Sequence, residues 1–229
     1  MINLFTCSDD TIAEFGREIW LNSRKYSGSF EDAAHYCAEA IYNGVCSDDG
    51  QPLFALVRFY RLIPYAEIPN DLRDLVAKQD GLNWALMGTF GIESAWRDRR
   101  LSRQHKVVAH NSSPMFEAAY QKIDRNSHVP IGTEDQLIFQ RGGILPYFYV
   151  PKALDSAVVP SQKDFVVRYG IKSVIGIGCK FISQTSFLGL AFSTTAITEH
   201  EAAKFVTMTP YISTLLADYD RTAQIWSQN

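Results

Sequence analysis

The feature that most constrains the fold is a pair of apolar segments at residues 171–182 and 187–193. The first segment is rich in Ile and Val and the second in Leu and Phe, and a short polar link of Ser, Gln and Thr separates them. Two such segments joined by so short a link predict an antiparallel β-hairpin. This part of the chain is therefore expected to belong to an antiparallel sheet.

Further strands are predicted before the hairpin. Residues 52–60 are rich in Leu, Val and Phe and follow a turn cluster, which indicates a largely buried strand. Residues 84–90 form a second apolar run, and residues 106–109 a shorter one. Residues 145–150 read as an aromatic strand, and Pro146 confines its start to the edge of a sheet because proline donates no ladder hydrogen bond.

Helices are predicted toward both ends of the chain. Residues 8–24 and 30–42 each carry one apolar face at helical spacing, and Gly44 suits the left-handed position after the second of them. A last helix begins at Thr198, with a Glu three residues later as a capping box, and Pro210 should kink it. Shorter helices are predicted at 68–78, 114–123 and 161–169.

These elements predict one α+β domain with a central antiparallel sheet. The expected divisions are N-terminal helices at 1–44, a sheet core with inserted helices at 45–197 and a C-terminal helix at 198–229. The chain has 229 residues, of which 46% are hydrophobic and 21% charged, and this excludes a disordered chain, a coiled coil and a collagen-like repeat. No repeat or low-complexity linker divides it.

Charge and hydropathy indicate the partners and the compartment. A net charge of −3 gives no basic field that would draw the protein to nucleic acid or to an anionic membrane. No apolar run is long enough to span a bilayer, and the N-terminus lacks the basic and apolar regions of a secretory signal. We therefore expect a cytoplasmic protein with no nucleic-acid and no membrane partner.

Standard catalytic and metal-binding signatures are missing. The four cysteines form no C-x-x-C pair, the five histidines are scattered, and neither a phosphate-binding loop nor a Gly-x-Ser-x-Gly motif occurs. Without an export signal the cysteines are expected to be reduced thiols. Cys37 on a helix face and Cys179 in a strand are interpreted as small core residues, and the Gly-x-Gly at 176–178 as a packing feature rather than a dinucleotide site.

A local basic stretch is the candidate for ligand contacts. Residues 96–106 hold five cations and one acid. This stretch is either a solvated loop or an anion contact, since arginine presents a planar fork of donors to carboxylate and phosphate. Trp96 can pack over an arginine or cover a pocket. Arg58 interrupts an apolar strand face, and it is either a strand-edge or ion-pair residue or a ligand contact.

Three separated blocks resemble the GAF-like input domains that precede PAS and histidine-kinase modules in bacterial sensors. They read ALVRFY at 55–60, AWRDRR at 95–100 with Ser102 and His105 after it, and PSQKDFV, YGIKSV and GIG between 160 and 178. The resemblance spans about residues 45 to 215 and implies a GAF-like fold. The Cys-His setting of bilin attachment and the Asn-Lys-x-x-Asp-Glu signature of cyclic-nucleotide sites are absent, and His105 or His110 would be a lone haem ligand. No familiar cofactor is implied, so the cofactor stays unknown.

The resemblance and the absent motifs together favour a non-catalytic sensory or regulatory module. It would bind a small ligand, with anions as a candidate class, and signal through a partner such as a kinase or regulator. The terminal helices would form a homodimer or partner surface, because the last apolar stripe is longer than one domain face usually needs. The alternatives are a GAF-fold thiol enzyme that reduces free methionine sulfoxide, with Cys37 and Cys46 as its thiol pair, and a purely structural interaction protein.

The predicted site lies where the block at 96–100 meets the helix at 161–169 and the sheet face that bears Arg58. Arginines supply its charge, Gln162 and His105 its polar contacts, and aromatic side chains a wall that excludes water. The alternative is an internal ion-pair network that anchors the loop to the sheet. The predicted site residues are Arg58, Trp96, Arg99, Arg100, His105, Gln162, Phe165 and Tyr169.

Overall fold

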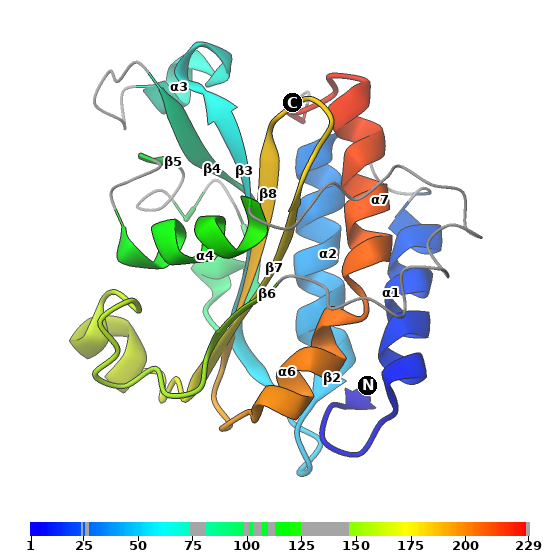
Figure 1. Ribbon diagram of the computed structural model, residues 1–229, viewed down its shortest axis with the longest axis vertical. Helices are drawn as coiled ribbons and strands as arrows, with labels where there is room; N and C mark the ends of the chain where they lie inside the picture. The colour runs from blue at the N-terminus through cyan, green and yellow to red at the C-terminus, as the bar shows by residue number, and fades with distance from the viewer. Residues whose placement is uncertain are drawn as a thin grey trace.

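The computed structural model describes residues 1–23, 25, 28–73, 81–98, 101–102, 107–109, 113–124 and 147–227. The described part of the chain builds a six-stranded antiparallel sheet with helices on both faces (Figure 1). The strand order is β5-β4-β3-β8-β7-β6, which confirms the predicted α+β fold with a central antiparallel sheet. The strands are β3 (Phe54–Pro64), β4 (Leu82–Gly91), β5 (Val107–Ala109), β6 (Tyr147–Val150), β7 (Ser173–Lys180) and β8 (Ser186–Ser193).

The predicted hairpin is present as β7 and β8. Its register runs from Ser173 opposite Ser193 to Lys180 opposite Ser186, and Gln184 takes a left-handed conformation in the turn, with φ at 69°. Strand β6 lies at one edge of the sheet, as predicted. Strand β3 continues past residue 60 and ends at Pro64. Proline is tolerated there because the end of the strand needs no ladder donor.

The helices from both ends of the chain cover the same face of the sheet. They are α1 (Asp9–Ser23), α2 (Phe30–Gly44), α6 (Glu199–Val206) and α7 (Thr209–Arg221) (Figure 1). Their apolar sides form one continuous core with that face. The opposite face is covered by α4 (Pro114–Asp124) and the π-helical segment η5 (Gln162–Val167), over a second core. The remaining short elements are β1 (Ile2–Asn3), β2 (Val45–Cys46), η1 (Tyr65–Glu67), α3 (Asn70–Arg73) and η2 (Ser94–Trp96).

Two details of the helices differ from the predictions. The last helix does not kink at Pro210 but is two helices, with Pro210 in the first turn of α7, where its missing N–H costs no hydrogen bond. Gly44 ends α2 without taking the left-handed conformation. A Cβ at Gly44 would lie 2.2 Å from the Phe15 ring, so the glycine makes room for α1 to pack. The capping box at Thr198 is present as predicted.

Interactions on the helix-covered face hold the ends of the chain in place. Lys204 of α6 is buried, and its Nζ donates to the carbonyls of Leu4 and Cys7 at 3.0 Å each. The apolar stripe of α7 from residue 209 to residue 217 is buried within a single chain. Tyr219 and Ala223, further along the same stripe, are not buried, and the dimer stays a prediction. All four cysteines are free thiols.

No helix among the described residues has the length and apolar character needed to cross a membrane.

Candidate functional site

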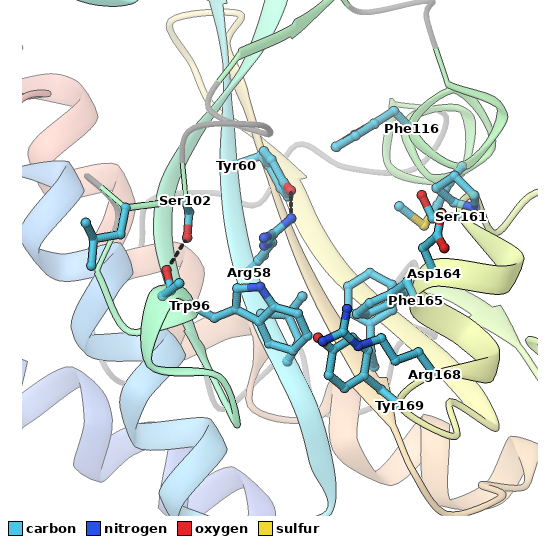
Figure 2. Close-up of a pocket in the computed structure, with 16 residues that line it drawn as sticks. Arg58, Tyr60, Trp96, Ser102, Phe116, Ser161, Asp164, Phe165, Arg168 and Tyr169 are labelled. Atoms are coloured by element: carbon cyan, nitrogen blue, oxygen red, sulfur yellow. Dashed lines mark hydrogen bonds between the residues drawn. The ribbon is translucent and has the colours of Figure 1, made fainter.

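A cavity of about 660 Å³ opens on the face of the sheet that lies opposite the terminal helices. Strands β3 and β8 form its floor, and η2 with the residues after it, α4 and η5 form its walls (Figure 2). The volume is in the range of cavities that enclose small organic ligands. Its lining residues are Leu56, Arg58, Tyr60, Ala95, Trp96, Leu101, Ser102, Met115, Phe116, Pro160, Ser161, Asp164, Phe165, Arg168, Tyr169 and Phe192.

Arg58 is the charged side chain at the floor of the cavity. It lies in the middle of the sheet, because β3 pairs with β4 on one side and with β8 on the other, so it is not a strand-edge residue. It is only 7% exposed. Its Nη1 donates to the Tyr60 hydroxyl at a long 3.5 Å, its Nε has no partner, and no acid in the described part of the chain pairs with it. The guanidinium therefore faces the cavity with unused donors.

Tyr60 accompanies Arg58 because side chains two residues apart on a strand point to the same face. Its ring meets that of Phe116 from α4 edge to face, with the ring centroids 4.8 Å apart. Phe116 in turn stacks on Trp84, which is fully buried behind the cavity. These three rings form the first aromatic cluster beside the guanidinium.

A second aromatic cluster lies on the other side of Arg58 (Figure 2). The Trp96 ring centroid is 4.7 Å from that of Tyr169 and 5.8 Å from that of Phe165. Phe165 meets Phe192 of β8 edge to face at 5.1 Å. The buried guanidinium thus lies between two groups of aromatic rings.

Polar contacts fix the second cluster in place. The Tyr169 hydroxyl donates to Glu93 Oε1 at 3.1 Å, and burial together with this hydrogen bond raises the pKa of Tyr169. Arg168 lies against the Tyr169 ring, with its Cζ 5.2 Å from the ring centroid, and is itself exposed. Ser102 donates to the Ala95 carbonyl at 2.8 Å and holds the chain after η2 against the cavity.

The segment around η5 carries unusual backbone geometry. Ser161 before it has a φ of 55°, and Gly170 after it a φ of 64°, so left-handed residues stand at both ends. A non-glycine residue in this region is strained, and π-helical turns are frequent at functional sites. The predicted helix at 161–169 is therefore present, but in a wider form that turns Phe165 and Tyr169 toward the cavity.

The structure brings together four of the predicted site residues, Arg58, Trp96, Phe165 and Tyr169, at one cavity. Gln162 lies outside it. The Gln162 amide donates to the Ala153 and Val159 carbonyls at 3.0 and 2.8 Å, and its oxygen accepts from the Asp155 amide, so it braces the preceding loop. The remaining predicted site residues, Arg99, Arg100 and His105, lie outside the described residues.

Sequence reasoning missed most of the lining. Tyr60 was within reach, because strand alternation places it on the same face as Arg58. Phe116 and Met115 lie on a helix whose position over the cavity depends on tertiary packing, and no local sequence pattern predicts that position. Asp164 and Arg168 lie on the predicted helix, but only the π-helical geometry determines which of its side chains reach the cavity.

None of the four cysteines lines the cavity. Cys37 and Cys179 are part of the core on the helix-covered face, where burial raises the pKa of the Cys37 thiol and raises that of Cys179 to about 12. Cys7 packs against the same core. Within the described ranges, no three His, Cys, Asp or Glu residues gather as metal ligands.

Comparisons with known proteins rest on structure. No protein-family model and no curated protein matches this sequence. The GAF domain of a phosphoenolpyruvate-protein phosphotransferase from Coxiella burnetii is 10% identical, with a TM-score of 0.54 over 95% of this chain and 99% of that one. The corresponding Acinetobacter domain is 11% identical, with a TM-score of 0.51 over 94% of this chain and 98% of that chain.

A free methionine-R-sulfoxide reductase from Neisseria meningitidis, solved in complex with its substrate, is also similar. It is 11% identical, with a TM-score of 0.53 over 94% of this chain and 93% of that one. The chain therefore has a GAF-like fold, as the three sequence blocks implied. Because the GAF domains of phosphotransferases and a methionine sulfoxide reductase share that fold, the comparisons do not decide the function, which has to be argued from the site.

Proposed function

We propose that this GAF-fold chain is a non-catalytic sensory or regulatory module whose cavity binds a small anionic ligand. The observation that carries the proposal is Arg58, a buried guanidinium at the cavity floor without an acidic partner among the described residues. A buried charge without a partner costs folding free energy. An external anion would supply the missing partner, and the aromatic walls would exclude water from the ion pair.

The element that passes on the bound state is proposed to be η5. It contributes Phe165 to the cavity, and Tyr169 follows two residues after its end. The left-handed residues Ser161 before it and Gly170 after it offer two points about which the segment can turn. A ligand that touches these rings would favour one position of η5 over another. A partner protein such as a kinase or regulator, or a second copy of this chain, would read that position.

The two alternatives have less support. A thiol enzyme that works in this cavity would need a cysteine there, and all four cysteines of the chain lie elsewhere. Burial also raises the pKa of Cys37, which disfavours its reactive thiolate form. A purely structural protein would fill its core with side chains, whereas this face keeps a cavity of about 660 Å³.

Native mass spectrometry of the purified protein, compared with denaturing mass spectrometry, tests the proposal. We expect a non-covalent adduct of small mass on the native wild-type protein, or one that appears after incubation with a cell extract, and its loss in Arg58→Gln. Arg221→Gln is the matched control, because it removes the same charge from an exposed position on α7. A protein that stays free of adduct under every condition, or an adduct that Arg58→Gln retains in full, would contradict the proposal.

A further inference from the structure

Among the described residues, the charges around the cavity favour a ligand with a single negative charge. Arg58 is the only cation among the described residues that both lines the cavity and is buried. One guanidinium neutralises one negative charge, and a second charge in the same dry space would lack a partner. The other cation on the described lining, Arg168, is exposed and lies against Tyr169.

The acidic residue on the lining also disfavours a second negative charge on the ligand. Asp164 is the one carboxylate among the described lining residues, and it is exposed on η5, away from the floor. Among the ion pairs of the described residues, none joins it to Arg168 four residues later. A ligand with a second acidic group at that side would be repelled by Asp164, so dicarboxylates and phosphate dianions are disfavoured.

The geometry of the free donors favours a carboxylate. The guanidinium is planar, with parallel donors that match the two oxygens of a carboxylate group, and the described residues give it only the long hydrogen bond to Tyr60. The Tyr60 hydroxyl accepts only a long 3.5 Å hydrogen bond from Arg58, so its proton is free to be donated to an anion beside the guanidinium. Two donors of different kinds thus converge at the cavity floor.

The walls favour an aromatic body on that carboxylate. On one side Tyr60 presents its ring with Phe116, and on the other Trp96 presents its ring with Phe165. Aromatic rings in such surroundings attract a further ring through offset and edge contacts beyond the area that they bury. The cavity of about 660 Å³ leaves room for one or two fused rings between these walls.

We propose that the ligand is an aromatic monocarboxylate, an inference that rests on the proposed function. Its carboxylate pairs with Arg58 and accepts from Tyr60, and its ring lies between the two aromatic clusters. Arg58 is the residue that distinguishes the acid from its neutral analogues, and Tyr60 supports it. No covalent step is involved.

Isothermal titration calorimetry, supported by ligand-observed NMR, tests this with matched pairs of probes. The pairs are phenylacetate with phenylacetamide, 3-phenylpropanoate with its amide, and 2-naphthoate with 2-naphthamide, and the probes outside the class are octanoate and phenyl phosphate. We expect at least one aromatic acid to bind about 10-fold or more tightly than its amide and than both outside probes, because a charged hydrogen bond to a buried group carries that much discrimination. Arg58→Gln should reduce the difference between acid and amide to within about 2-fold.

Two further variants keep the result interpretable. Tyr60→Phe retains the ring and removes the hydroxyl, so it should weaken the acid several-fold while the amide is unchanged. Arg221→Gln should bind all probes as the wild-type protein does, because Arg221 lies on α7 behind the sheet. Circular dichroism confirms that each variant is folded.

Failure of the ligand class and failure of the proposed function give different results. Tighter binding of phenyl phosphate or octanoate, lost in Arg58→Gln, would overturn the aromatic monocarboxylate and leave the anion-binding module intact. Equal affinity for acid and amide would overturn the role of Arg58. If no probe binds but the native protein still carries an Arg58-dependent adduct, the aromatic monocarboxylate class is also overturned. If no probe binds and no adduct is found, both proposals are overturned.

Discussion

We expect the same substitution, Arg→Met, to have opposite effects on stability at the two arginines of β3. Arg61 faces the helix-covered side and is 4% exposed, and its Nε and Nη2 donate to Asp220 of α7 at 3.1 and 2.7 Å. Asp220 also accepts from Ser183 and Thr185, so the ion pair joins α7 to the β7–β8 turn. Arg58 faces the cavity, is similarly buried, and has no acid as a partner among the described residues.

Arg61→Met should cost about 3–5 kcal/mol of unfolding free energy, because it leaves the buried Asp220 carboxylate without its countercharge. For a domain of this size, 1 kcal/mol corresponds to about 2–4 °C, so the Tm should fall by roughly 6–20 °C. Arg58→Met should leave the unliganded protein unchanged, or stabilise it by up to about 3 kcal/mol, because an unpaired buried polar group is removed. Arg221→Met, at an exposed pair, should change stability by less than about 1 kcal/mol.

Urea unfolding followed by circular dichroism, with calorimetry for the Tm, measures these differences on protein freed of ligand by refolding. The decisive comparison is Arg58→Met with Arg61→Met in the same buffer. If Arg58→Met lost as much stability as Arg61→Met, Arg58 would be a structural ion-pair residue and the anion-binding argument would fail. If Arg61→Met behaved like Arg221→Met, the buried pair with Asp220 would not be the anchor of α7.

Three further predictions concern packing, pH and the η5 segment. Gly88→Ala should destabilise the protein by about 1–3 kcal/mol in urea unfolding, because its Cβ would lie 2.2 Å from the Ala34 carbonyl oxygen, whereas Gly81→Ala, with open space around it, should cost far less. Since burial raises the pKa of Cys179 from 9.0 to about 12, its contribution to stability is complete below pH 9 and decreases as the pH rises toward 12, by up to about 1.4 kcal/mol per pH unit. Replacement of Cys179 by Ala should reduce this alkaline loss in unfolding curves at pH 8 and pH 10. Gly170→Ala should cost about 1–2 kcal/mol of stability through its left-handed φ alone, since no atom lies near the new Cβ, and hydrogen exchange should show faster opening of η5.

The strands and helices could be predicted because their patterns are local. The hairpin at β7 and β8 carries apolar runs and a polar turn that no tertiary contact has to supply. The Thr198 capping box likewise belongs to one stretch of sequence. The predicted kink at Pro210 was wrong, since this proline lies in the first turn of a new helix. The apolar pattern around a proline is the same in the first turn of a helix and within a long helix, so the local sequence does not distinguish the two cases.

The site could be predicted only in part, because it depends on which segments meet across the sheet. Arg58 and Trp96 stood out as a charge within an apolar strand and an aromatic residue within a basic stretch. Gln162 had the composition of a ligand contact, but its amide is used to brace the loop at residues 153–159. Phe116 reaches the cavity from a helix with an ordinary amphipathic pattern, so only the position of α4 over β3 identifies it.

The sheet separates two uses of buried charge, and this separation is the basis for expecting function on one face. Where the helices cover the sheet, Arg61 is neutralised within the chain and Lys204 donates to carbonyls of the N-terminal segment, so charge stabilises the arrangement of the ends. Where η5 covers the sheet, Arg58 finds no such partner in the described part of the chain, and a cavity lies beside it. Under the proposed function, substitutions at the cavity floor alter ligand affinity far more than folding, and substitutions at the Arg61–Asp220 pair do the reverse. On the same proposal, ligand exchange takes place on the face away from the terminal helices and leaves the Arg61–Asp220 packing on the other face undisturbed.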